Sequence, residues 1–185
     1  MPKTLRMAAI VLVSASHFAA RAQTPEQAKP EHRGLSLQLS AGPYSGFGGG
    51  LGFGTRDVGV RGLVGWAPVI VVVERPTSSD LELYSSLLVG PDLYFRLFRP
   101  RPATDIGGLA GYRYDSLLGH GVSFGGYARV ELSRALDVDI SVGFLVFPDG
   151  ENRLKQERNL PSSTQFSFPG PKVNFGISVG LSFFP

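Results

Sequence analysis

The sequence predicts an all-β protein, an eight-stranded antiparallel up-and-down transmembrane β-barrel. Apolar residues alternate with small or polar residues over eight segments, and a period of two is that of an extended strand. Glycine is abundant, with 24 of the 185 residues, and each glycine inside a helix costs roughly 1 kcal/mol relative to alanine. No apolar run approaches the length of about 20 residues with which a helix crosses a membrane.

The C-terminal segment shows the alternation most clearly. One face of an extended chain carries Val173, Phe175, Ile177, Val179, Leu181 and Phe183, and the other carries Asn174, Gly176, Ser178, Gly180 and Ser182. A helix would scatter both sets around its circumference. Seven upstream segments alternate in the same way, at residues 35–41, 47–54, 58–66, 81–97, 106–114, 122–132 and 136–146. Together they give the eight predicted strands.

Turn-forming residues separate these segments, at 43–46, 55–57, 76–80, 99–102, 116–119, 133–135 and 148–171. The second, fourth and sixth connections are short, and the third and seventh are longer. Outer-membrane barrels place short turns at one end and longer loops at the other. Pro68 and the run from 69 to 73 interrupt the third segment, so the pattern leaves the register of its second half undefined.

The first 22 residues have the features of a cleaved secretory signal peptide. Lys3 and Arg6 precede a short apolar run at residues 7–15, and residues 20–22 (Ala-Arg-Ala) form a small-x-small cleavage site. The apolar run is too short for a membrane anchor. We expect three parts in the chain: a signal peptide at 1–22, a flexible lead-in at 23–33 and the barrel at 34–185.

Loss of the signal peptide makes the mature chain electrically neutral. Three of the 18 Lys and Arg residues lie within it, so 18 − 3 = 15 cations remain against 15 Asp and Glu residues. No clustered basic patch is present, which argues against nucleic-acid binding. The chain has no cysteine, so disulfides, thiol nucleophiles and Cys-ligated metals are excluded.

Alternation alone fits a soluble barrel or sandwich with its apolar face inward equally well. The character of the other face favours the membrane orientation, because that face carries mainly glycine and serine, which suit a narrow lumen. No Asp, Glu, Lys or Arg falls on the apolar face. Candidates for aromatic girdles at the membrane interfaces are Trp66, Phe95, Tyr112, Tyr114 and Phe183.

Charges of both signs fall on the small-residue face and need partners inside a lumen of low dielectric constant. The cations are Arg61, Arg96, Arg113 and Arg129, and the anions are Glu82, Asp92, Asp105, Asp115, Glu131, Asp137 and Asp139. From these we expect a lumen charge network made of Arg61, Glu82, Arg96, Arg113, Arg129, Glu131 and Asp139.

Several segments resemble the small outer-membrane β-barrel proteins of Gram-negative bacteria. The resemblance rests on residues 88–95 (LVGPDLYF), on the glycine-aromatic segments 107–112 and 124–130, and on the C-terminal strand. In that strand Phe175, Ile177, Val179, Leu181 and Phe183 look like the signal read by the outer-membrane assembly machinery. The chain departs from the pattern by continuing with Phe184 and Pro185. The resemblance implies an outer-membrane location, and many such proteins have no assigned activity.

An enzymatic site is not expected. His120, Ser123 and Glu131 are the nearest candidates for a lipid A-modifying site, but His120 and Ser123 are three positions apart and point to opposite faces of a strand. Ser123 and Glu131 share a face but are too far apart for hydrogen-bond contact. No histidine spacing suggests a metal site, and the glycine-rich run at 48–54 lacks phosphate-loop spacing. No cofactor or metal is therefore expected.

The expected function is a structural or surface-interaction role for a monomer with a plugged lumen and a charged extracellular loop. Arg153, Lys155 and Arg158 make the long loop basic, so lipopolysaccharide is a candidate partner besides the membrane lipid itself. Eight strands leave a lumen that side chains fill, which argues against a diffusion pore. Two alternatives stay open: a soluble periplasmic barrel or sandwich that binds a small apolar ligand, and a lipid A-modifying barrel enzyme.

Overall fold

A computed structural model describes residues 34–75 and 78–185 of the chain. The expected signal peptide and lead-in, residues 1–33, lie outside the described residues. The strands are β1 (Gly34–Ala41), β2 (Phe47–Gly54), β3 (Val58–Arg75), β4 (Ser78–Arg101), β5 (Thr104–Asp115), β6 (Gly119–Ser133), β7 (Leu136–Val146), β8 (Gln165–Ser167) and β9 (Val173–Phe183). One helix is described, α2 (Gly150–Glu157).

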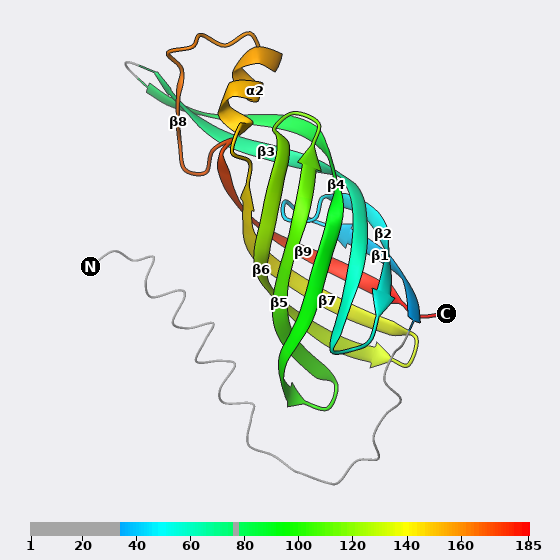
Figure 1. The fold of residues 1–185 in the computed structure, drawn as a ribbon. Helices are drawn as coiled ribbons and strands as arrows, with labels where there is room; N and C mark the ends of the chain where they lie inside the picture. The colour runs from blue at the N-terminus through cyan, green and yellow to red at the C-terminus, as the bar shows by residue number, and fades with distance from the viewer. Residues whose placement is uncertain (1–33, 76–77) are drawn as a thin grey trace, which may run out of the picture.

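Eight of these strands close into a ring (Figure 1). Each of β1 to β6 pairs antiparallel with the next strand along the chain, β7 pairs with β9, and β9 also pairs with β1 to complete the circle. The short strand β8 lies outside the ring on the far end of β3. The prediction of an all-β antiparallel barrel is confirmed, with a ring strand at each of the eight alternating segments.

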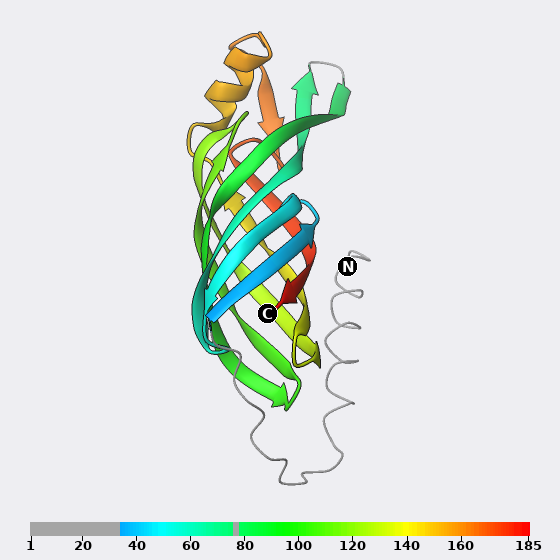
Figure 2. The same cartoon turned by 90° about the vertical axis from the view of Figure 1, so that its right-hand side faces the viewer.

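The two ends of the barrel differ in their connections (Figure 2). One end, here called the loop end, carries α2, β8 and the connections β1–β2, β3–β4 and β5–β6. The opposite end, the turn end, carries the short connections β2–β3, β4–β5 and β6–β7 and the C-terminus. Strands that run up and down around a ring place alternate connections at opposite ends, as the sequence predicted.

The apolar face of the strands points out of the ring. On β4 the side chain of Leu81 is 70% exposed and that of Leu93 is 53% exposed, whereas Asp92, between Pro91 and Leu93, is 1% exposed. The same holds on β2, where Phe53 is 65% exposed. In the described chain, the outward Asp, Glu, Lys and Arg residues of the ring strands lie within the last few residues of a strand, as Glu74 does on β3 and Arg99 on β4. The barrel is therefore enclosed in a continuous apolar belt.

The third, fourth and seventh connections differ most from the sequence-based expectation. The third connection, expected at 76–80, is only residues 76–77, because Ser78–Asp80 already pair with the end of β3. The breaker expected at 99–102 is shorter, since β4 continues to Arg101. The seventh connection, expected at 148–171 as a plain loop, contains both α2 and β8.

The structure also defines the register of β3 beyond Pro68. The pairing of β3 with β4 runs without a break from Val58 opposite Phe95 to the end of the strand, with Pro68 opposite Ser85. Proline lacks an N–H donor, so it is tolerated where the donor would face no partner strand. Beyond Trp66, β2 no longer pairs with β3, and Pro68 lies in that unpaired stretch.

Glycine allows neighbouring strands of the narrow ring to approach closely at Gly125 in β6. A Cβ atom at Gly125 would fall against the carbonyl oxygen of Val142 and 2.8 Å from the Gly143 Cα atom. A Cβ atom at Gly62 in β3 would meet nothing within 4 Å.

We therefore expect Gly125→Ala to lower the free energy of unfolding by about 1–3 kcal/mol, the usual cost of overpacking. Gly62→Ala is the matched control and should leave stability unchanged or slightly improved. Urea unfolding of the purified protein in detergent micelles, followed by tryptophan fluorescence, measures both. Equal stability of the two variants would contradict this account of the strand packing.

Candidate functional site

The interior of the barrel is the candidate functional site, and it has two layers. Towards the centre and the turn end it is lined by charged and hydroxyl side chains. Towards the loop end it is apolar. The sequence-based expectation of glycine, serine and paired charges holds for the first layer and is wrong for the second.

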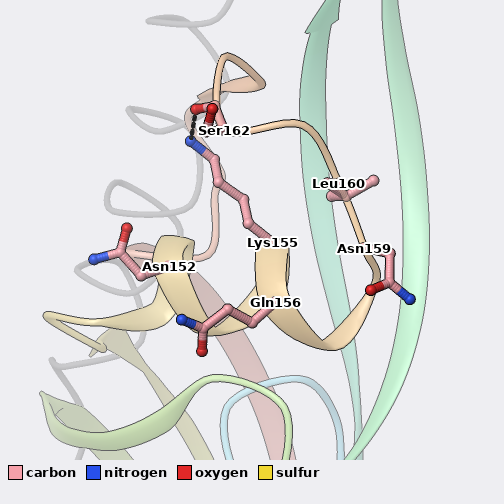
Figure 3. Close-up of a pocket in the computed structure, with 6 residues that line it drawn as sticks. All are labelled: Asn152, Lys155, Gln156, Asn159, Leu160 and Ser162. Carbon is pink, nitrogen blue, oxygen red and sulfur yellow. Dashed lines mark hydrogen bonds between the residues drawn. The ribbon is translucent and has the colours of Figure 1, made fainter.

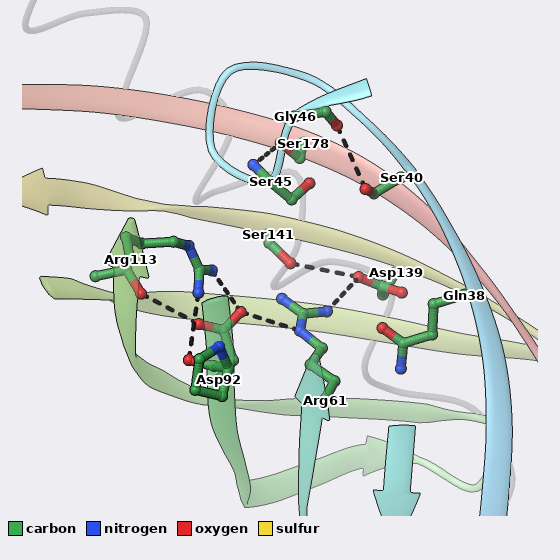
Figure 4. A network of polar contacts seen from close by, with 12 residues as sticks. Gln38, Ser40, Ser45, Gly46, Arg61, Asp92, Arg113, Asp139, Ser141 and Ser178 are labelled. Carbon is green, nitrogen blue, oxygen red and sulfur yellow. Dashed lines mark hydrogen bonds and ion pairs between the residues drawn. The ribbon is translucent and has the colours of Figure 1, made fainter. Parts of the chain in front are cut away.

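The central charge cluster consists of Arg61, Asp92, Arg113 and Asp139, all at most 5% exposed (Figure 4). Asp92 on β4 is its hub. Its Oδ2 atom lies 2.7 Å from Nη2 of Arg113 and 3.1 Å from Nε of Arg61. Its Oδ1 atom accepts a hydrogen bond of 3.1 Å from the hydroxyl of Ser123. One buried carboxylate thus has both of its oxygens satisfied, which offsets part of its desolvation cost.

One contact of this cluster crosses the lumen. Nη1 of Arg61 on β3 lies 3.5 Å from Oδ1 of Asp139 on β7. These strands are not neighbours in the ring, because β4, β5 and β6 separate them on one side and β2, β1 and β9 on the other. The hydroxyl of Ser141 donates a hydrogen bond of 3.3 Å to the same Asp139 oxygen. The side chains therefore close the interior at this level.

A second group, the turn-end charge cluster, consists of Arg56, Arg96, Arg99, Asp105 and Glu131. Asp105 on β5 is fully buried and contacts Nε of Arg56, Nε of Arg99 at 2.9 Å and Nη1 of Arg96 at 3.6 Å. Arg56, in the β2–β3 connection, also reaches Glu131, with 2.8 Å between Nη1 and Oε2. Burial alone would lower the pKa of the Arg56 guanidinium. Its hydrogen bonds and charge attraction with Asp105 and Glu131 outweigh burial and raise that pKa.

Arg129 lies between two tyrosine rings. Its guanidinium carbon is 4.9 Å from the centroid of the Tyr94 ring and 5.2 Å from that of the Tyr127 ring. Aromatic faces attract cations, more strongly where water is excluded. The hydroxyl of Tyr94 donates to the carbonyl oxygen of Thr55 at 2.9 Å, which ties this part of the interior to the β2–β3 connection.

The β1–β2 connection folds into the lumen. Tyr44 is fully buried, and the guanidinium carbon of Arg113 lies 5.9 Å from the centroid of its ring. The backbone N–H of Ser45 donates to the hydroxyl of Ser178 on β9 at 2.9 Å. Gly42 begins this turn with φ +140°, where a side chain would be strained and would also meet the Ile177 carbonyl oxygen. The turn therefore acts as a plug above the central charge cluster.

The upper apolar layer lies above this plug. Its buried side chains come from β3, β4, β7, α2 and the loop-end connections: Val69, Val71, Val73, Leu88, Leu117, Leu118, Leu145, Phe147 and Leu154. The run from 69 to 73 contributes through its odd-numbered residues, which point inward once β3 keeps its register. Leu154 on α2 is fully buried, so the helix closes the loop end over this layer.

The structure brings most of the expected lumen residues into these clusters. Arg61, Arg113 and Asp139 lie in the central cluster, and Arg96 and Glu131 lie in the turn-end cluster, while Arg129 stacks between tyrosines. Glu82 lies elsewhere, on the loop-end part of β4, where it accepts a hydrogen bond from the hydroxyl of Tyr84.

The sequence-based selection left out Arg56, Asp92, Asp105 and Tyr44. Asp92 and Asp105 were on the correct face, but alternation does not show which anion becomes a hub. Arg56 and Tyr44 lie in turns, where no alternation indicates direction.

The C-terminal set faces outward. Phe175, Ile177, Val179 and Phe183 are exposed on β9, and Leu181 is half-buried. The ring of Phe175 lies 5.4 Å from that of Phe144 on β7. The expected girdle aromatics Trp66, Phe95, Tyr112 and Tyr114 also point outward, in keeping with the apolar belt.

The three loop cations point to different neighbours. Nζ of Lys155 donates to the carbonyl oxygen of Ser162 at 3.0 Å and lies 5.7 Å from the Phe166 ring centroid. Arg158 lies over the ring of Tyr84 at 4.8 Å, and Arg153 lies beside Gly119. Lys155 lies in an open hollow of about 600 Å³. The hollow is lined by Asn152, Lys155, Gln156, Asn159, Leu160 and Ser162 (Figure 3). The cations do not converge on one anion site.

The candidate catalytic residues do not meet. His120 is exposed on the outer face and contacts the hydroxyl of Tyr112, whereas Ser123 is buried and donates to Asp92. Glu131 is paired with Arg56. Within the described residues, no group of three His, Asp or Glu side chains is placed to hold a metal ion.

Comparison with known proteins identifies no relative: no family model, curated protein or solved structure matches the chain. Among the described helices, none is long and apolar enough to cross a membrane.

Removal of the hub of the central charge cluster takes away the ion pair of the buried Arg113 guanidinium and leaves Arg61 with the 3.5 Å contact to Asp139. We therefore expect Asp92→Ala to lower the free energy of unfolding by about 3–5 kcal/mol, the usual cost of breaking a buried ion pair. Asp149→Ala is the control, because Asp149 is exposed and makes no side-chain capping bond to α2. It should change stability by less than about 0.5 kcal/mol. Urea unfolding in micelles compares them, and a tolerated Asp92→Ala would refute the hub role.

Proposed function

We propose that the chain is an outer-membrane β-barrel protein of Gram-negative bacteria, with the eight ring strands crossing the lipid bilayer. In this proposal it reaches the outer membrane as an exported monomer after loss of the signal peptide. It has a structural or surface-interaction role, with a plugged lumen and no catalytic activity.

The observation that supports the proposal most is the direction of the apolar face. A belt of leucine, valine, isoleucine and phenylalanine surrounds a closed ring whose charges lie inside or at the strand ends. A soluble barrel would expose this belt to water, and monomeric soluble proteins rarely expose apolar patches of more than a few hundred Å². In lipid, a closed ring leaves few strand edges without partners, and an arginine or lysine at mid-depth of the belt would cost about 2–4 kcal/mol.

The plugged lumen favours a role at the membrane surface over solute passage. The ion pair between Arg61 and Asp139 and the inserted ring of Tyr44 both occupy the space that a pore would need. The separation of His120, Ser123 and Glu131 gives no support to the lipid A-modifying alternative. The soluble periplasmic alternative requires an apolar interior pocket and a polar exterior, which is the reverse of most of this barrel.

Cell fractionation tests the proposal. The mature protein should sediment with outer membranes and, when extracted in mild detergent without boiling, migrate on a gel at a different position from the boiled sample. A closed hydrogen-bonded barrel stays folded in the detergent until it is heated. Recovery of the protein in the soluble periplasmic fraction would refute membrane insertion. Altered lipid A masses in cells that express the protein would instead support the enzyme alternative.

Lipopolysaccharide is a second proposed partner, contacted through the loop cations Arg153, Lys155 and Arg158. If these cations bind its phosphates, replacing all three with glutamine should weaken binding of the purified protein to lipopolysaccharide, and added salt should weaken binding by the unchanged protein. The control is Arg134→Gln, an exposed cation at the turn end. Surface plasmon resonance measures the affinities. Unchanged binding by the triple variant would remove this partner and leave the barrel proposal intact.

A further inference from the structure

The barrel wall is interrupted beside the β1–β2 connection. β2 pairs with β3 only as far as Phe47 opposite Trp66, and β1 pairs with β9 only as far as Ala41 opposite Val179. β3 and β9 both extend further towards the loop end. Across residues 34–75 and 78–185, no strand pairs with positions 67–71 of β3 or 173–178 of β9 on the sides that face each other.

This interruption, here called the wall window, has defined borders. Its sides are residues 67–71 and 173–178, and the plug turn at residues 42–46 closes it towards the turn end. The backbone of residues 168–172 closes it towards the loop end. There the N–H of Val72 donates to the carbonyl oxygen of Pro169 at 3.3 Å, and the N–H of Gly170 donates to that of Val173 at 3.0 Å.

The side chain of Asn174 spans the wall window. Asn174 accepts the N–H of Phe175 through Oδ1 at 2.9 Å, and its Nδ2 donates to the carbonyl oxygen of Ile70 at 3.4 Å. It thereby satisfies one backbone donor of β9 and one backbone acceptor of β3. Because backbone groups alternate in direction along a strand, Pro68 faces the same side as Ile70 and lacks an N–H to offer there.

The wall window joins two apolar regions. Outside it lie Trp66, Phe175 and Ile177, which belong to the exposed belt. Inside it, a cavity of about 20 Å³ reaches the upper apolar layer, lined by Pro43, Ala67, Pro68, Val69, Ile70, Leu88, Asp115, Leu118, Leu145, Phe147 and Asn174. Asp115 is the one charged lining residue, and its oxygens already accept bonds from Ser86 and from the backbone of Leu117 and Leu118.

We propose that the wall window admits the acyl chain of a membrane lipid into the upper apolar layer. The hydrogen bonds of Asn174 to Ile70 and Phe175 hold the window closed until the chain enters. The inference rests on the membrane insertion proposed above, because the belt outside the window would then be in contact with lipid chains. The lining offers apolar surface and no unpaired charge for a headgroup. A strand from a second copy fits this edge poorly, since Pro68 interrupts the donors that such a strand would need.

Entry requires a local rearrangement. A cavity of about 20 Å³ has room for roughly one water molecule. The Asn174 bonds must open, and Leu118 and Phe147 must move aside. Both of these side chains come from connections at the loop end and not from the middle of a strand, so their displacement leaves the strand pairings of the ring in place.

Photo-crosslinking tests the inference. The full mature protein is folded into vesicles of phosphatidylethanolamine and phosphatidylglycerol that contain a trace of phosphatidylethanolamine with a diazirine midway along one acyl chain. After illumination, mass spectrometry maps the adducts. We expect adducts on outward residues such as Ile177 and Phe124, and additional adducts on the inward residues Ala67, Leu88 and Leu145. The inward residue Tyr127, in the charged layer, should carry none.

Two variants show whether the inner adducts arise through the wall window. Ala67→Leu fills its inner rim and should abolish the inner adducts while the outer adducts persist. Ala110→Leu, the same change on the outer face of β5, should leave both sets unchanged. Asn174→Ala should increase the inner adducts. The unboiled gel mobility of each variant checks that it has folded.

The outcomes separate the two proposals. Outer adducts without inner ones in the unchanged protein would overturn the acyl-chain site and leave membrane insertion standing. Absence of adducts everywhere would overturn both. Inner adducts that survive Ala67→Leu would show entry by another route and would also overturn the role of the wall window. In a variant with a photoreactive amino acid at position 70, crosslinks to a second copy of the chain and none to lipid would overturn the acyl-chain site and identify a second copy as the occupant.

Discussion

Closure of the sheet is the constraint on which the rest of this structure depends. In the proposed bilayer a strand edge would have no water to satisfy its N–H and C=O groups, and only a neighbouring strand could satisfy them along its whole length. The pairing of β1 with β9 provides that neighbour and turns a meander into a ring. Once the ring is closed, every strand has one face outward and one face inward. Alternate residues of each strand must then suit two different surroundings, the outside of the ring and its lumen.

A ring of eight strands is narrow, and this narrowness accounts for the interior. Large side chains cannot face each other at every level, so glycine and serine occupy many inward positions. The charges that remain must be paired, because water cannot solvate them there. The buried charges are paired at two different depths of the lumen: Asp92 pairs with two arginines and Asp105 with three. The same pairs fill the lumen, so the groups that stabilise the barrel also block it.

Alternation predicted the strands well because outward side chains are exposed and inward side chains are buried, and the residue types change with that difference at every second position. Alternation could not predict the features of segments in which residues do not alternate. Helix α2 is one short helix with a single buried large apolar side chain, Leu154, too little for a helical period to be visible. Arg56 and Tyr44 point inward from turns, where no pattern distinguishes the directions. Asp92 and Asp105 each pair with several arginines because of the register between neighbouring strands. The sequence of one strand does not show that register.

The first hairpin is short, and within the described residues its early end interrupts the closure of the ring and explains several other features. β1 and β2 end early, so the turn between them lies at the level of the lumen and its tyrosine becomes the plug. The same early end deprives β3 and β9 of partners above the plug. The sequence compensates there with a proline, which has no donor to leave unsatisfied, and with Asn174, whose amide replaces two ladder bonds. Since a side-chain amide can rotate away where a strand cannot, the wall is weakest beside the apolar layer that α2 covers.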